Sequence, residues 1–275
     1  GSLTQINSGW LATKGRLHDG QNQLGAEEPE NSLLENRAKM EFGPGIILED
    51  DFLTPAECAE ISQKVLSLKP HWEPRLGPYQ FATLGCAAYL DAVEAATDYA
   101  QKSGSLNPLM QETFREVYER IRLYFSRILD AEAYYDQAFS YPGFHLFQLD
   151  GNEIADDNPA ARAHFDYQFA RVFPDFQKAL ATPLTFTIPI EEPSHGSSLE
   201  MWDLRPEGHA EIEYEHVQYA RTHPSKTVPY SVGRIFTHDG LNLHAIGKVS
   251  AGSRGRRMTL QGHAFKKEKG WILYW

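Results

Sequence analysis

The second half of the chain is dominated by short β-prone runs. From about Tyr135 onward, runs of five to nine residues rich in branched and aromatic side chains are separated by segments that contain Pro and Gly. Such spacing is typical of antiparallel strands joined by turns, and it predicts an all-β sandwich or a closed barrel. The runs are Phe144 to Leu149, Leu184 to Ile190, Leu199 to Leu204, Ile212 to Tyr219, Gly233 to Thr237 and Arg257 to Phe265. No repeat of about 20 to 50 residues is visible, which excludes solenoids and propellers.

The first half of the chain predicts helices. A short strand pattern ends near Phe52, and Thr54 after it is a candidate N-cap with Glu57 three residues later. This capping-box signature predicts a helix that runs to about Leu68. Two further helical regions are predicted, at Tyr89 to Gln101 and Leu109 to Leu129. We expect the three helices to pack together on one side of the sheet.

The chain divides into a short arm and one domain. Residues 1–40 mix Gly, Asn, Gln and Glu with little apolar periodicity, so we expect a loosely ordered arm. Residues 41–275 form the predicted domain, with mainly helical support over 41–135 and the β core over 136–275. The last five residues, Trp271 to Trp275, are too apolar for a solvated tail and are expected to pack at the sheet margin.

Charge and cysteine content limit the class of partner. The chain has 26 Lys and Arg against 37 Asp and Glu, a net charge of −11, which argues against nucleic-acid backbones and anionic membranes as partners. A small-molecule substrate is favoured, and the oligomeric state is left open. The two cysteines, Cys58 and Cys86, form no CxxC motif, which fits a reducing, cytoplasmic setting. The sequence also has no apolar stretch long enough for a membrane span.

Histidine and aspartate combine in a spacing suited to a metal. His164 and Asp166 are two residues apart, so in a strand both side chains would point to the same face. His244 follows 78 residues after Asp166 and is flanked by apolar residues. Two imidazoles and one carboxylate can bind Fe(II) on one face, which leaves three coordination positions open. The alternative is a hydrogen-bonded strand pair and an ordinary core histidine.

An arginine then follows in the last predicted strand. Arg257 and Thr259 share one face of that strand, opposite Met258 and Leu260. An arginine that points into a barrel is costly unless it meets a carboxylate, and its planar guanidinium suits a bidentate partner. That carboxylate could belong to the protein or to a ligand.

With these residues the sequence resembles the Fe(II)- and 2-oxoglutarate-dependent oxygenases. The family pattern is an HxD motif, a distal His and, shortly beyond, an Arg followed two residues later by Ser or Thr. Leu48 to Cys58 also looks like the opening of prolyl-hydroxylase-like members, and Gly233 to Arg254 looks like the family's final strands. The resemblance, from about residue 46 to 265, implies a double-stranded β-helix (a cupin-like jelly roll) flanked by N-terminal helices.

The resemblance implies roles for individual residues. His164, Asp166 and His244 would be the catalytic residues that hold iron, while Arg257 and Thr259 would bind the distal carboxylate of 2-oxoglutarate. O₂ would be the other cosubstrate. Arg254 is an alternative anchor, although its Gly- and Ser-rich surroundings are more typical of a turn. Because halogenating relatives replace the aspartate with a small residue, the retained aspartate favours hydroxylation, and desaturation stays open.

The expected substrate contacts are less specific. His145, Gln168 and Trp202 are candidate substrate-binding residues, with core packing as the alternative for His145 and Trp202. His263 shares a face with Arg257 and could lie behind the metal ligands, whereas Thr185 fits simple β-propensity. The favoured function is hydroxylation of a C–H bond in a biosynthetic or amino-acid-derived small molecule, with release of succinate and CO₂. The alternatives are a protein or peptide hydroxylase and a non-catalytic jelly-roll metal-binding or sensor protein.

Overall fold

A large antiparallel sheet forms the centre of the molecule. The computed structural model describes residues 38–42, 45–75, 80–92, 96–150, 159–172, 183–205, 213–248 and 252–275. Within these ranges ten strands join in the larger sheet, in the order β1-β2-β10-β7-β12-β6-β4-β3, and β13 connects β12 to β5. The strands are β1 (Ala38–Phe42), β2 (Gly45–Asp51), β3 (Glu73–Arg75), β4 (Gln80–Leu84), β5 (Ala133–Tyr135), β6 (Gly143–Asp150), β7 (Leu184–Glu191), β10 (Arg234–Asp239), β12 (Arg254–Lys267) and β13 (Gly270–Tyr274). The β13–β5 pair is parallel and the others are antiparallel.

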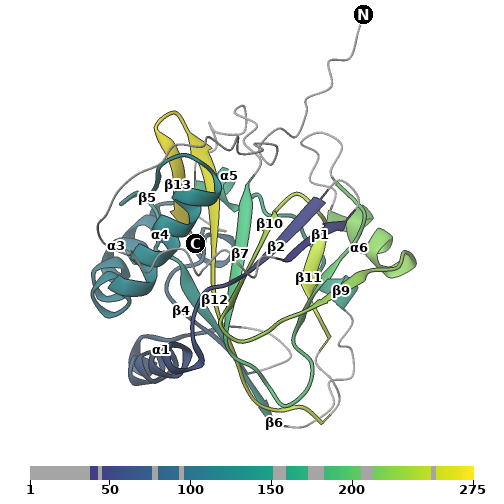
Figure 1. Ribbon diagram of the computed structural model, residues 1–275, viewed down its shortest axis with the longest axis horizontal. Helices are drawn as coiled ribbons and strands as arrows, with labels where there is room; N and C mark the ends of the chain where they lie inside the picture. The colour runs from purple at the N-terminus through teal and green to yellow at the C-terminus, as the bar shows by residue number, and fades with distance from the viewer. Residues whose placement is uncertain are drawn as a thin grey trace, which may run out of the picture.

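A smaller sheet lies on one side of the larger sheet, and α1 (Pro55–Ser67), α3 (Ala96–Thr113) and α4 (Arg115–Ile128) lie on the other (Figure 1). The smaller sheet has the order β11-β8-β9, with β8 (Ser198–Met201), β9 (Lys226–Pro229) and β11 (His244–Ile246). The other described helices are α2 (Ala88–Asp91), α5 (Gln168–Val172) and α6 (Glu213–Thr222), with 3-10 turns at Lys69–His71 and Pro159–Arg162. Figure 1 shows α1, α3 and α4 beside the larger sheet, whereas α6 lies near the smaller one. None of the described helices is long and apolar enough to cross a membrane.

The start of α1 follows from its sequence. The backbone N–H of Glu57 donates to the Thr54 hydroxyl over 3.2 Å, and the backbone N–H of Thr54 donates to the Glu57 carboxylate over 2.7 Å. This confirms the expected capping box, which satisfies two backbone donors at the helix end. The predicted strand before it is β2, and the predicted helix ends within one residue of Leu68.

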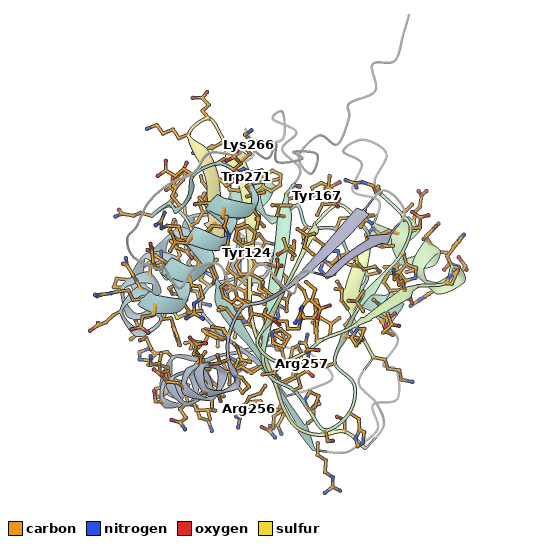
Figure 2. All side chains as sticks on the ribbon, in the orientation of Figure 1. Tyr124, Tyr167, Arg256, Arg257, Lys266 and Trp271 are labelled. Carbon is orange, nitrogen blue, oxygen red and sulfur yellow. The ribbon has the colours of Figure 1, made fainter. Side chains whose placement is uncertain are left out.

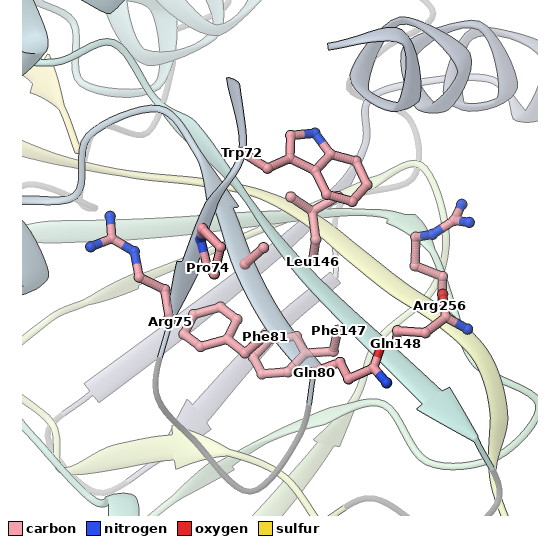
Figure 3. Close-up of a pocket in the computed structure, with 10 residues that line it drawn as sticks. Trp72, Pro74, Arg75, Gln80, Phe81, Leu146, Phe147, Gln148 and Arg256 are labelled. Carbon is pink, nitrogen blue, oxygen red and sulfur yellow. The ribbon is translucent and has the colours of Figure 1, made fainter. Parts of the chain in front are cut away.

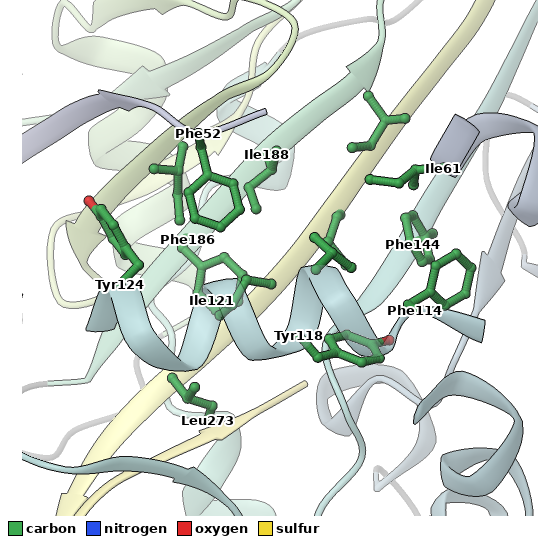
Figure 4. Packing of buried hydrophobic residues seen from close by; sticks show 14 of the residues in the cluster. Phe52, Ile61, Phe114, Tyr118, Ile121, Tyr124, Phe144, Phe186, Ile188 and Leu273 are labelled. Carbon is green, nitrogen blue, oxygen red and sulfur yellow. The ribbon is translucent and has the colours of Figure 1, made fainter. Parts of the chain in front are cut away.

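The main hydrophobic core lies between the helices and the larger sheet. Figure 4 shows Tyr118 and Ile121 of α4 directed toward the strands that carry Phe144 and Ile188. Met258 and Leu260 of β12 are fully buried in the same cluster. The helical layer therefore covers one face of β12, as the alternation of its sequence predicted.

Several predicted elements differ from the structure. Ile212 to Tyr219 was predicted as a strand, but the described residues there form α6. The exposed residues Glu215 and Gln218 are three apart, which is helical spacing, and both are good helix formers. The β8 strand ends at Met201 rather than Leu204. One continuous helix, α3, also covers the gap predicted between the second and third helical regions, with Pro108 inside it.

The described residues cover only part of the predicted division into an arm and one domain. Residues 1–37 of the predicted arm lie outside the described residues, and the boundary at residue 40 falls inside β1. Residues 41–135, expected to be mainly helical, also supply β2, β3, β4 and β5 to the larger sheet. The two shortest of these, β3 and β5, have three residues each, which is too short for a periodic pattern to reveal them. The C-terminal segment pairs with β12 and β5 and is buried, as its apolar sequence indicated.

Candidate metal and cosubstrate site

Backbone hydrogen bonds bring the two histidine segments together. The N–H of His164 donates to the carbonyl of His244 over 2.9 Å, and the N–H of His244 donates back over 3.1 Å. The N–H of Asp166 donates to the carbonyl of Gly240 over 2.8 Å. His164 thus sits in an isolated β-bridge rather than in a regular strand, which corrects the expected geometry of the HxD motif. The side chains of His164 and Asp166 are therefore positioned by backbone pairing with the segment Gly240 to His244, and not by the alternation of a regular strand.

Three side chains converge at this point. One ligand atom from each of His164, Asp166 and His244 lies within 4.8 Å of the others. The Nε2 atom of His244 is 3.2 Å from Oδ2 of Asp166, and Nε2 of His164 is 3.7 Å from Oδ1. His164 is 49% exposed at its side chain, whereas Asp166 and His244 are buried. The group is therefore open to solvent on the His164 side.

The tautomers of the two imidazoles are fixed by the backbone. Nδ1 of His164 lies 2.8 Å from the carbonyl of Arg162, and Nδ1 of His244 lies 2.7 Å from the carbonyl of Asn242. A carbonyl oxygen only accepts, so both Nδ1 atoms carry the proton. Both Nε2 atoms therefore face the Asp166 carboxylate, and Nε2 is the nitrogen through which each ring would bind a metal.

The charges around Asp166 are strongly coupled. Burial alone would raise the pKa of this carboxyl, but His244 and His263 hold its pKa well below the usual range. Burial would likewise lower the pKa of His244, yet the neighbouring Asp166 carboxylate raises that pKa overall. The carboxylate is consequently charged near neutral pH, as a metal ligand must be.

A layer of polar groups on the larger sheet supports Asp166. The Thr185 hydroxyl donates a short hydrogen bond to Oδ2 of Asp166 and lies 3.1 Å from Nδ1 of His263. That Nδ1 atom is 3.8 Å from the same carboxylate oxygen. Thr185 of β7 is in register with His238 of β10 and with His263 of β12, so one cross-strand row lies beneath the carboxylate. The position of His263 agrees with its predicted face, while the role of Thr185 was missed because a strand threonine also fits plain β-propensity.

The loop beside Asp166 needs a glycine. A Cβ atom built on Gly240 would lie 2.6 Å from Cβ of Asp166, a distance that real Cβ contacts do not reach. The carbonyl of this glycine accepts the hydrogen bond from the backbone N–H of Asp166. Gly240 therefore both allows its loop to lie close to Asp166 and helps to position that residue.

Arg257 and Thr259 lie on the inner face of β12. Arg257 is only 1% exposed and Thr259 is fully buried. Among the described residues, none forms a hydrogen bond with Nε or either terminal nitrogen of Arg257, or with the Thr259 hydroxyl. The guanidinium carbon lies 5.4 Å from the Phe147 ring centre and 5.8 Å from that of Tyr230. Burial lowers the pKa of Arg257, although nearby Tyr230 and Glu192 oppose the shift.

The neighbouring arginines face elsewhere. Arg254 is exposed, and Arg256 donates to Glu191 over 2.9 Å on the other side of the strand. Figure 2 places Arg256 and Arg257 at the same end of β12, far from Lys266 at the other end. Of these three arginines, Arg257 is therefore the one directed into the interior.

The three predicted substrate-binding residues lie in different surroundings. His145 is buried on β6, and its Nε2 lies 2.6 Å from the Tyr89 hydroxyl. The indole N–H of Trp202 donates to the carbonyls of Ala220 and His223, in a small core cluster beside α6. Packing is thus the sufficient explanation for this tryptophan. Gln168 begins α5, but its side chain lies outside the described residues.

A separate pocket of about 330 Å³ opens at the edge of the larger sheet (Figure 3). Trp72 and Leu146 provide apolar walls, and Gln148 and Arg256 provide polar atoms. The residues of the metal group do not line it. Arg256 lines this pocket, and so does Phe147, whose ring also contacts the Arg257 guanidinium, so the pocket adjoins the wall that carries Arg257.

Comparison with known proteins supports the architecture. No family model and no curated protein sequence matches the chain. Among solved structures, an N-substituted L-amino acid dioxygenase from Burkholderia ambifaria AMMD matches with a TM-score of 0.54 and 17% identity, covering 83% of this chain and 85% of that one. The chain shares that dioxygenase's fold. A crystal structure of that dioxygenase in complex with alpha-KG matches with a TM-score of 0.53 and 16% identity over 83% and 85% of the two chains. The fold is a double-stranded β-helix with a helical layer, as expected.

Proposed function

We propose that the protein is an Fe(II)- and 2-oxoglutarate-dependent oxygenase that hydroxylates a C–H bond of a small molecule. The observation that carries this proposal is the buried guanidinium of Arg257. It faces the same interior as a two-histidine, one-carboxylate group and has no hydrogen-bond partner among the described residues. A metal group alone would not require such an arginine.

The three side chains fit the proposed metal. Two imidazole nitrogens and one carboxylate oxygen are the donor set of the facial triad that non-haem Fe(II) enzymes use. The contacts of both Nδ1 atoms with backbone carbonyls leave Nε2 of each histidine available to a metal, and Thr185 orients Asp166. The half-exposed side chain of His164 leaves one side accessible to exogenous ligands.

The arginine and threonine fit the cosubstrate. A buried cation without an anion costs several kcal/mol, and a carboxylate can satisfy the guanidinium bidentately. The Thr259 hydroxyl, two residues along the same face, has no hydrogen-bond partner in the described part of the chain and supplies a further donor. A molecule with a metal-chelating end and a distal carboxylate meets both requirements, and 2-oxoglutarate is such a molecule.

The protein's residues would then divide the work. His164, Asp166 and His244 would hold the iron, and Arg257 with Thr259 would hold the distal carboxylate. Phe147 and Tyr230, which flank the guanidinium, exclude water from that contact. When bound, iron and 2-oxoglutarate supply the oxidising chemistry, in which O₂ is consumed, 2-oxoglutarate leaves as succinate and CO₂, and a substrate C–H bond is hydroxylated.

An amino-acid derivative is the favoured substrate class. The structurally similar dioxygenase is described as acting on N-substituted L-amino acids, and its fold covers most of this chain. The buried free thiols of Cys58 and Cys86 fit an enzyme of the reducing cytoplasm.

A turnover assay tests the proposal. The protein would be loaded with Fe(II) under anaerobic conditions and mixed with 2-oxoglutarate and one candidate substrate. The candidates would be N-substituted amino acids, free amino acids and peptides. Air would then be admitted, and the succinate formed would be measured. We expect iron-dependent succinate that one class of small molecule increases. Stimulation by peptides alone would favour a protein hydroxylase. No succinate with any candidate, despite intact iron binding, would refute the enzyme and leave a metal-binding sensor.

A further inference from the structure

We infer that His145 is a further positioning residue for the cosubstrate: its Nδ1–H donates to the distal carboxylate beside Thr259, and Tyr89 fixes the tautomer that makes this possible. The inference rests on the proposed function, because it names an additional contact of the same anion site. Neither the metal group nor the Arg257–Thr259 pair requires it.

His145 lies next to the proposed anion contacts. In the β6–β12 ladder His145 is directly opposite Thr259, and Phe147 is opposite Arg257. Directly opposed residues point to the same face, with Cβ atoms about 5 Å apart. His145, Thr259 and Arg257 are therefore neighbours on one buried wall, and Thr83 of β4 flanks His145 on its other side.

The Nδ1 atom of His145 is unused. It is inaccessible to solvent and forms no hydrogen bond among the described residues, like the Thr259 hydroxyl and the Arg257 guanidinium. Three adjacent side chains thus bury polar atoms without partners, although most buried polar atoms in proteins are paired. One oxygen-rich anion would satisfy all three, since a carboxylate has about four acceptor positions.

Tyr89 selects the protonated nitrogen. Its hydroxyl is 2.6 Å from Nε2 of His145. Burial raises the pKa of Tyr89, so the phenol keeps its proton, and burial together with Arg257 holds the pKa of His145 well below its usual range. The imidazole is consequently neutral. A phenol is a stronger acid than a neutral imidazole N–H, so Tyr89 donates to Nε2 and the ring proton resides on Nδ1.

Aromatic neighbours fix the plane of the imidazole. The ring centres of Phe81 and Trp275 each lie 5.2 Å from that of His145. With Tyr89 bound at Nε2, the ring has little freedom to rotate, so Nδ1 keeps its direction. Such a preorganised donor is typical of binding sites.

Two amide substitutions separate positioning from structural support. His145→Asn keeps a donor near the Nδ1 position, whereas His145→Gln places its amide near the Nε2 position and keeps only the contact with Tyr89. Binding of 2-oxoglutarate to Fe(II)-loaded protein without oxygen would be measured by calorimetry. We expect His145→Gln to weaken binding roughly 10- to 100-fold, the range for a hydrogen bond to a charged group. His145→Asn should stay within about threefold of wild type. Circular dichroism melting would accompany each variant.

The tautomer has its own measurement. In protein labelled with ¹⁵N-histidine, the His145 signals should show the Nδ1–H form, and Nδ1 should shift when 2-oxoglutarate is added. Tyr89→Phe should increase the Nε2–H form and weaken 2-oxoglutarate binding by about three- to tenfold. An Nε2–H tautomer in the wild type would overturn the inference.

The outcomes also separate this inference from the proposed function. If the wild type binds no 2-oxoglutarate, the proposed function fails. If Arg257→Met loses binding while both His145 variants bind like wild type, only the inference about His145 fails. If His145→Gln binds 2-oxoglutarate like wild type while His145→Asn does not, the contact of Nε2 with Tyr89 is what matters. His145 then has a structural role, and the inference is overturned.

Discussion

The two faces of β12 differ in the side chains that they bury, apolar on one face and polar on the other. Met258 and Leu260 face the helices and are fully buried among apolar side chains. Arg257 and Thr259, their immediate neighbours, face the space between the sheets and bury polar atoms without hydrogen-bond partners among the described residues. The helix face contributes to the stability of the fold, whereas the site face reduces it, and the proposed cosubstrate would supply the missing partners.

This difference predicts opposite signs for substitutions on the two faces. Truncation on the helix face should lower the free energy of unfolding and leave ligand binding unchanged. Replacement of an unpaired polar residue on the site face should weaken ligand binding while stability stays level or rises. Four substitutions, taken from the largest expected effect to the smallest, would break or sharpen the comparison.

Asp166→Ala should have the largest effect. It removes the proposed carboxylate ligand. Loss of a residue that only hydrogen-bonds to a metal ligand lowers metal affinity roughly 10- to 100-fold, and loss of the ligand itself should lower it more. We expect Fe(II) affinity to fall roughly a thousandfold, measured by anaerobic titration. Asp203→Ala, which changes an exposed aspartate, is the matched control and should bind iron like wild type. Equal iron affinity in the two variants would refute the metal assignment.

Leu260→Ala tests the helix face. Leu260 is fully buried in the main core, so its truncation should lower the free energy of unfolding by about 3 kcal/mol through lost contacts and a cavity. The measurement is chemical denaturation of the metal-free protein. Leu123→Ala, at a half-exposed leucine of α4, should change stability by less than about 0.5 kcal/mol. A similar loss in both would show that burial against the sheet is not what stabilises this layer.

Arg257→Met tests the site face. The variant keeps side-chain length but removes the charge, so 2-oxoglutarate binding should weaken about 30-fold, equivalent to about 2 kcal/mol. The ligand-free protein should become more stable by about 1 kcal/mol, because an unpaired buried cation is lost while its ring contacts are partly replaced.

Arg254→Met is the control for the anchor. Its side chain is exposed, so binding and stability should both stay near wild type. If Arg254→Met weakens 2-oxoglutarate binding more than Arg257→Met does, the anchor belongs at residue 254 and the comparison between the two faces of β12 is lost.

Local signals predicted the elements whose causes are local. The capping box at Thr54 and Glu57 defines the start of α1 through contacts between residues three apart. The alternation along β12 separated Arg257 from Met258, because side chains on a strand point alternately to opposite faces. These features depend on neighbours in the sequence, so a single sequence contains them.

Features that depend on distant contacts were harder to predict. The approach of His164 to Asp166 depends on a bridge to His244, not on a local strand. The hydroxyl of Thr185 reaches Asp166 from β7, and Tyr89 reaches His145 from α2. Trp202 was a candidate substrate contact with core packing as the alternative, and its indole packs in a cluster beside α6. The spacing of residues in the sequence does not reveal which side chains from distant segments come into contact.

Glu57→Gln should have the smallest effect and tests the helical layer away from the sheet. Glu57 of α1 pairs with Arg120 of α4 over 2.6 Å, and this hydrogen bond, with those from Thr54, lowers the pKa of Glu57 to about 2. Because the folded pKa lies below the usual 4.5, the stabilisation is fully present above pH 4.5 and is lost as the pH falls toward 2. The Glu57 side chain is 35% exposed, so water screens the pair and the variant should lose less than about 1 kcal/mol at pH 7. Denaturation curves of wild type and variant should converge between pH 4.5 and 2, and a difference that persists unchanged at low pH would show that Glu57 stabilises the layer by packing rather than by charge.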